Sequence, residues 1–166
     1  MLTIEKKSLK VGKYVTTEHV NTVIRNYKQE RWVHNSEHIG KEDSLSVWFS
    51  VEELEGFMEK IKQYGADGIK FYFGAYSNDY ADKPEYAGRQ TLVMVATKHK
   101  ETETGWMNKD VYVNGQTGTE ILAYNGGGIC PPNCGGQGRG GSGDGDDWGG
   151  IGLTIVDRGE KGLAIV

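Results

Sequence analysis

Two histidines and a glutamate in the first quarter of the chain have the spacing of a metalloprotease motif. The run HNSEH over residues 34–38 matches H-x-x-E-H, in which two histidines one helical turn apart bind zinc and the glutamate acts as a base. The second and third residues of the run are weak helix formers and Gly40 follows closely, which favours a solvated polar turn. We expect the turn, and keep His34 and His38 as candidate zinc ligands.

Cys130 and Cys134 are the only cysteines, and their C-x3-C spacing lies within the range of zinc-ligand pairs. With His34 and His38 they would complete a Cys2His2 set, although about 90 residues separate the two pairs. A disulfide would form under oxidation, but a cytosolic protein does not normally keep one. We therefore expect two reduced cysteines in a mobile loop, with zinc binding as the alternative.

A long connection over residues 74–90 joins two predicted strands and exceeds the usual length of a hairpin loop. It holds Tyr76, Tyr80 and Tyr86, whose large amphipathic rings suit contact with a partner or ligand, and Arg89, which adds polar specificity. The alternative is that the rings pack the loop onto its own sheet. Both interpretations stay open, and these four residues are the candidate partner-binding set.

Glycine is concentrated in residues 126–150, which hold 12 of the 25 glycines of the chain. So little side-chain surface cannot offset the entropy of ordering the backbone, which predicts a flexible insert. G-x-G-x-x-G occurs at 136–141, but no strand precedes it and no helix follows, so it does not indicate dinucleotide binding. The apolar runs 151–156 and 163–166 then predict a C-terminal hairpin.

The helices that must position these residues follow from capping and periodicity. Residues 45–50 alternate apolar and polar side chains, as in a strand with one buried face. Ser50 and Glu53 then form a capping box, and apolar residues at helical spacing follow until a glycine ends the helix. Upstream, an amphipathic N-terminal helix is predicted to begin at Thr16 or Thr17.

Three further segments read as strands. Residues 69–73 alternate, and residues 91–97 are apolar on both faces, as in a central strand. Parallel pairing of 69–73 with the strand before the capped helix would make a right-handed βαβ unit. Residues 110–113 and 120–124 flank a glycine-containing turn and predict an antiparallel hairpin.

Taken together, the 166 residues predict a single α+β domain that has a mixed β-sheet with a βαβ unit, the N-terminal amphipathic helix and antiparallel hairpins. The domain covers residues 1–125, the glycine-rich insert 126–150, and the hairpin of the same domain 151–166. A formal charge of −4 gives no basic field for phosphates, and no apolar run is long enough to span a bilayer. We expect a cytoplasmic protein with neither nucleic-acid nor membrane partners.

Four segments resemble an uncharacterised family of small bacterial proteins. They are VWFS at 47–50, DGIKFYFG at 67–74, TLVMVAT at 91–97 and CPPNC at 130–134. The resemblance covers most of the chain and implies a single soluble bacterial domain. It carries over no activity, cofactor or catalytic residue.

These observations favour a small non-enzymatic binding or protein-interaction module that needs no cofactor and takes an unidentified protein or small ligand. The alternative is a zinc-dependent or thiol enzyme built on His34, His38, Cys130 and Cys134. The metal content of the purified protein separates the two hypotheses.

Overall fold

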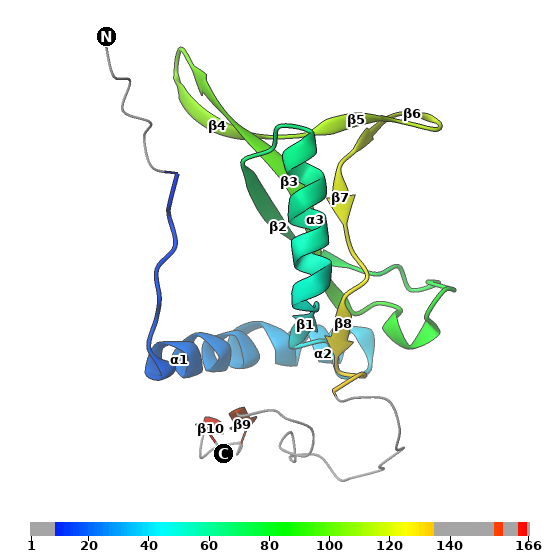
Figure 1. The fold of residues 1–166 in the computed structure, drawn as a ribbon. Helices are drawn as coiled ribbons and strands as arrows, with labels where there is room; N and C mark the ends of the chain where they lie inside the picture. Colours follow the sequence, from blue (N-terminus) through cyan, green and yellow to red (C-terminus); the bar gives the residue numbers. More distant parts are fainter. Residues whose placement is uncertain (1–8, 135–154, 158–162, 166) are drawn as a thin grey trace.

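The computed structural model describes residues 9–134, 155–157 and 163–165 (Figure 1). The helical elements are α1 (Thr17–Tyr27), the π-helical η1 (Lys28–Trp32), α2 (Val33–Ile39), α3 (Val51–Gln63) and the 3-10 turn η2 (Pro84–Tyr86). The strands are β1 (Ser46–Trp48), β2 (Gly68–Ala75), β3 (Gln90–Thr102), β4 (Gly105–Asp110), β5 (Tyr112–Gly115), β6 (Gly118–Ile121), β7 (Ala123–Tyr124), β8 (Gly128–Cys130), β9 (Ile155–Asp157) and β10 (Leu163–Ile165).

A long helix made of α1, η1 and α2 runs from Thr17 to Ile39 without a break. Thr16 caps its start by accepting a hydrogen bond from the backbone N–H of His19 at 3.2 Å, which confirms the predicted N-terminal helix. Gly40 ends it with a left-handed φ of +71°. The polar turn expected at residues 34–38 is wrong, because this segment is the last part of the helix. The helix residues Ser36 and Trp32 hydrogen-bond the backbone of Asp43 beyond Gly40, and these tertiary contacts outweigh the weak helix propensity of residues 35–36.

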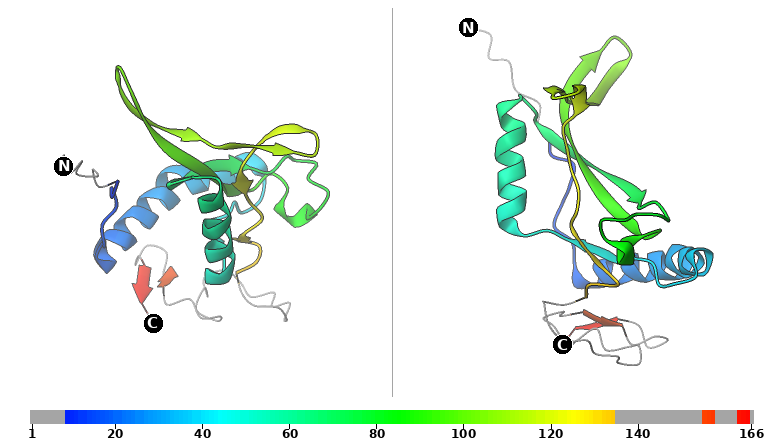
Figure 2. Two further views of the ribbon diagram at one scale, coloured as in Figure 1. Left: turned by 45° about the horizontal axis from the view of Figure 1, so that its top comes forward. Right: turned by 90° about the vertical axis from the view of Figure 1, so that its right-hand side faces the viewer.

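Helix α3 begins with the predicted capping box. Ser50 Oγ accepts from the N–H of Glu53 at 3.1 Å, and Glu53 Oε2 accepts from the N–H of Ser50 at 2.9 Å. The helix covers one face of the sheet, and Figure 2 shows the two as separate layers with the long helix lying across one end. The buried residues of the core between these layers are Phe57, Ile61, Ala66, Met94, Ala96 and Leu122.

Strand β3 is the centre of the main sheet, as its apolar faces predicted. It pairs with β2, β4 and β7, and every one of these ladders is antiparallel. The α+β class is therefore confirmed, but the predicted mixed sheet and its βαβ unit are wrong, because every described ladder is antiparallel. Strand β1 pairs with β8 instead, antiparallel, with Val47 opposite Ile129. Alternation buries one face of a strand without specifying its neighbour, and here the partner comes from more than 80 residues away along the chain.

Both predicted hairpins are confirmed as antiparallel pairs. Strands β5 and β6 pair around the turn at residues 116–117, and β9 pairs with β10. The glycine-rich insert was predicted to begin at Gly126, but residues 126–134 include β8 and belong to the fold, whereas 135–150 lie outside the described residues. Within the described part of the chain, no helix has the length and apolar character needed to cross a membrane.

Replacing Ser50 with alanine removes one half of the capping box. We expect the free energy of unfolding to fall by about 1 kcal/mol, because an N–H at the start of α3 loses its acceptor. Denaturant titration of wild type and variant measures the change. The matched control is Ser46→Ala on an exposed position of β1, which should alter stability by less than about 0.5 kcal/mol. Equal losses in the two variants would contradict a specific capping contribution.

Candidate functional site

A groove of about 680 Å³ opens between the long helix and the end of the main sheet. Its walls come from parts of the chain that are distant in sequence: the long helix, Asp43 before β1, the end of β2, and residues 88–90 at the start of β3. The lining residues are Tyr27, Arg31, Asn35, His38, Ile39, Asp43, Phe73, Gly74, Ala75, Gly88 and Gln90.

The two walls of the groove differ in chemistry. Tyr27, Arg31, Asn35 and His38 are spaced three or four residues apart, so they lie along one face of the long helix and form a polar wall. Opposite them, the ring of Phe73 on β2 is 82% exposed. An exposed aromatic ring beside a polar helix face can contact the apolar part of a ligand, while side chains of the helix hydrogen-bond the ligand's polar groups.

Asp43 lies at the base of the groove and is only 3% exposed. Its Oδ1 accepts hydrogen bonds from the backbone N–H groups of Ser44 at 2.8 Å and Gln90 at 2.6 Å. Its own N–H donates to Ser36 Oγ at 2.9 Å, and its carbonyl accepts from Trp32 Nε1 at 2.8 Å. No donor among the described residues reaches Oδ2, so this oxygen is the acceptor that the site offers a ligand.

Tyr27 stands beside this carboxylate as a neutral donor. Its hydroxyl donates to Gln90 Oε1. Burial raises the pKa of the Tyr27 hydroxyl, and the charge of Asp43 raises it further, while side-chain hydrogen bonds with Asn35 and Gln90 lower it by smaller amounts. The phenol therefore keeps its proton at neutral pH, and Tyr27 shapes and polarises the groove without acting as a base.

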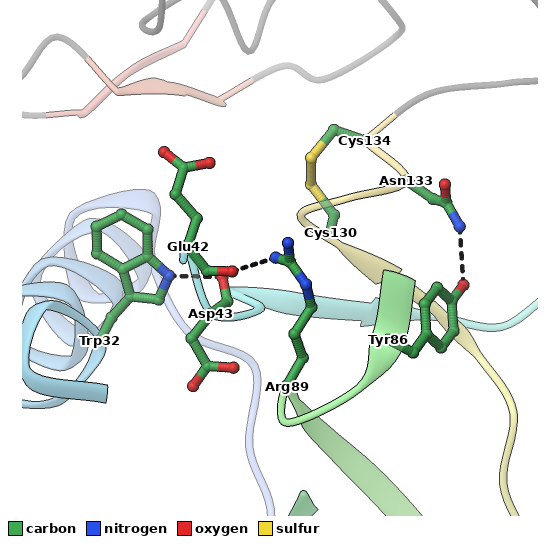
Figure 3. Close-up of a disulfide and its surroundings, with 8 residues drawn as sticks. All are labelled: Trp32, Glu42, Asp43, Tyr86, Arg89, Cys130, Asn133 and Cys134. Carbon is green, nitrogen blue, oxygen red and sulfur yellow. Dashed lines mark hydrogen bonds between the residues drawn. A yellow bond between two sulfur atoms is a disulfide. The ribbon is translucent and has the colours of Figure 1, made fainter. Parts of the chain in front are cut away.

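Arg89 is buried behind the groove and holds the backbone there. Figure 3 shows Trp32 and Arg89 approaching the backbone of Glu42 and Asp43 from opposite sides. Arg89 Nη1 donates to the carbonyl of Glu42, and Nε donates to the carbonyl of Glu85 at 2.9 Å. Because both bonds go to the chain's own carbonyl groups, the geometry gives Arg89 a structural role, and partner contact by Arg89 stays a prediction.

The tyrosine loop, residues 76–89, packs on itself. The rings of Tyr76 and Tyr80 stack with centroids 4.5 Å apart, and Tyr76 lies 5.6 Å from Tyr86, which is buried. This arrangement supports the packing interpretation, and partner binding by Tyr76 and Tyr80 stays a prediction. The loop still bears on the site, because Gly88 follows Tyr86 and lines the groove. Its N–H donates to the carbonyl of Tyr76 at 3.1 Å.

Cys130 and Cys134 form a disulfide, so the expectation of two reduced cysteines in a mobile loop is wrong in this structure. Cys130 is buried, and its carbonyl accepts from the N–H of Leu45 at 2.7 Å. Asn133, inside the disulfide loop, donates from Nδ2 to the hydroxyl of Tyr86 at 2.9 Å (Figure 3). The CPPNC segment is thus fastened both to the start of β1 and to the tyrosine loop.

The predicted zinc ligands do not form one cluster. His34 and Glu37 are exposed on α2, with His34 Nδ1 3.9 Å from Glu37 Oε2, while His38 lines the groove. Among the residues that the structure describes, no three histidine, cysteine, aspartate or glutamate side chains converge on a point that could hold a metal ion. With the sulfur atoms joined, zinc binding at the four predicted residues requires reduction of the disulfide and stays a prediction.

A second polar cluster lies on the face of the sheet opposite α3. Lys70 Nζ contacts Asp110 Oδ1 at 2.8 Å, and the hydroxyl of Tyr72 donates to Asp110 Oδ2 at 2.9 Å. The hydrogen bond to Asp110 raises the pKa of Lys70, and that same bond lowers the pKa of Asp110. A protonated lysine cannot act as a nucleophile, so the cluster is a clasp between β2 and β4.

Sequence reasoning missed most of the groove, although it named His38. Tyr27, Arg31 and Asn35 recur every four residues along an amphipathic helix, and Asp43 is an acid placed directly before an apolar strand. Those are the two signals that could have found the site. Comparison with protein-family models, with curated proteins and with solved structures gives no match to this chain.

Replacing Asp110 with asparagine should remove a pH-dependent contribution to stability. The folded pKa of Asp110 is lowered by Lys70, so its contribution is present above the pKa of the unfolded carboxyl, about 3.9, and is lost as pH falls through the folded pKa. The stability difference between wild type and variant should therefore be largest near neutral pH and vanish in acid. Denaturation at a series of pH values measures it. The control, Asp79→Asn at an exposed position of the tyrosine loop, should change stability near neutral pH by less than about 0.5 kcal/mol.

Replacing both Cys130 and Cys134 with serine should lower the free energy of unfolding by about 2 kcal/mol, because a short disulfide loop restricts the unfolded chain by about that amount. Adding a reductant to the wild type should reproduce the loss, whereas the double variant should not respond to it. A wild type that is insensitive to reductant, or that shows two free thiols in a thiol assay, would contradict a structural disulfide.

Proposed function

We propose that this protein is a binding module without chemistry of its own, and that the groove beside Asp43 receives its ligand. The observation that carries the proposal is a carboxylate buried at the base of an open groove with one oxygen committed to the fold and the other uncommitted. Asp43 Oδ2 is not among the buried atoms that lack a partner, so it is open to the groove, where it can accept from a ligand that supplies a donor.

The ligand that fits this description carries an amino group joined to an apolar body. An ammonium group donates to Asp43 Oδ2 and balances the negative charge there. The apolar body lies against the ring of Phe73, and the Tyr27 hydroxyl is already occupied by Gln90. Arg31 and His38 stand on the helix side, where they can meet an acidic or polar group at the far end of the ligand.

The fold supports a binding role because hydrogen bonds from residues behind the groove fix the backbone of Glu42 and Asp43. Trp32, Ser36 and Arg89 bond the backbone and leave the Oδ2 acceptor of Asp43 uncommitted. A site whose walls are fixed before the ligand arrives loses less entropy on binding than one assembled from mobile loops. This pre-arrangement is what a binding module needs.

Paired probes that differ only in the donor group test the proposal. We expect 2-phenylethylamine to bind the groove more tightly than 2-phenylethanol, with chemical shifts changing at Phe73 and Asn35. Asp43→Asn keeps an oxygen that can accept from Ser44 and Gln90 but removes the charge. It should weaken amine binding by about 10- to 100-fold, as loss of a charged hydrogen bond of about 1.5–3 kcal/mol does, and leave the alcohol unaffected.

Two further variants act as controls. Phe73→Ala should weaken both probes alike, because it removes apolar contact and no charge. Trp48→Ala removes another exposed ring, which lies on β1 outside the groove, and should change neither affinity. Each variant is first checked for its fold by circular dichroism. Equal affinities for amine and alcohol, or wild-type amine binding by Asp43→Asn, would contradict the proposal.

A further inference from the structure

Strand β2 has an open edge. It pairs with β3 along all eight of its residues, and no other described strand pairs with it. The N–H of Tyr76 donates to the carbonyl of Arg89 at 3.0 Å, which fixes the alternation of the antiparallel ladder. Residues 70, 72 and 74 therefore direct their backbone groups toward β3, and Ile69, Phe71 and Phe73 direct theirs outward.

The side chains on this edge are not those that normally block strand addition. Phe71 is 54% exposed and Phe73 is 82% exposed, and both project on the side of α3. Edges are usually protected by proline, by a bulge or by a charge that points outward. The one lysine of the strand, Lys70, lies on the opposite face and is bound to Asp110. This edge is a template for one more strand.

The chain also carries a segment suited to fill it. Residues 9–15, here called the arm, precede the helix cap and run as an extended segment on the same side of the molecule as β2 (Figure 1). The arm contains Val11, which is 95% exposed, and Tyr14, which is fully exposed. Valine and tyrosine favour strands, and seven extended residues match the length of an eight-residue strand.

We propose that the arm of a second copy of this chain adds to the open edge of β2, so that two copies exchange arms. In Figure 1 the arm and β2 run in the same direction, so in this arrangement the chain's own arm would add as a parallel strand. A second copy can present its arm antiparallel, which is the more stable ladder, and a twofold axis repeats the contact. The arm has two lysines and no acid, whereas the whole chain has a formal charge of −4.

Light scattering on the full chain across a dilution series tests the exchange. Wild type should have twice the monomer mass of 18.3 kDa, and Phe71→Lys and Val11→Pro should each have the monomer mass. Neither residue lines the groove, so ligand binding by these variants reports separately on the proposed function. The control, Tyr112→Lys, alters an equally exposed aromatic ring on β5 and should leave the dimer intact.

Hydrogen exchange supplies a second readout. The amides of Phe71 and Phe73 point away from β3, so they should be protected in the wild type and exchange rapidly in Val11→Pro, whose helix and sheet content should be unchanged. A wild type that stays monomeric overturns the proposal. A dimer that survives both substitutions overturns it as well, as does a dimer in which these two amides exchange freely.

Discussion

One buried aspartate joins three parts of the chain that are far apart in sequence. Asp43 receives hydrogen bonds from the amides of Ser44 and Gln90 and from the indole of Trp32, and it donates to Ser36. A carboxylate can be buried only where hydrogen bonds replace its water shell. The long helix, β1 and the start of β3 must therefore meet at this residue, and the groove is the space left where they meet.

The core between α3 and the sheet is small, and several large apolar rings are left in solvent as a consequence. Helix α3 covers one face of the sheet through Phe57 and Ile61, while the other face carries the Lys70–Asp110 clasp. A two-layer arrangement of this size leaves large apolar rings such as Phe73 and Trp48 in solvent. Large exposed apolar patches lower the solubility of a protein, and where they occur they often mark a binding or interaction site. In the two proposals made above, Phe73 contacts the ligand and Phe71 lies on the edge of β2 that receives the arm.

Local signals in the sequence predicted the elements well, and the long-range contacts poorly. The Ser50–Glu53 capping box and the apolar faces of β3 depend on neighbouring residues, so their patterns are visible in the sequence. The pairing of β1 with β8 depends on residues far apart in the chain, which no local pattern encodes. The polar cluster around Asp43 was missed for the same reason. Its acceptors and donors become a site only when the helix and sheet are placed together.

The disulfide closes a short loop that contacts both the start of β1 and the tyrosine loop. The carbonyl of Cys130 accepts a hydrogen bond from the N–H of Leu45 at the start of β1, and Asn133 donates to the hydroxyl of the buried Tyr86. The loop between the cysteines therefore contacts both β1 and the tyrosine loop, which border the groove. Directly after it the sequence turns glycine-rich, where backbone ordering is most costly. Disulfides are typical of oxidising compartments. Here the disulfide closes directly after β8, whose partner strand β1 begins three residues after Asp43.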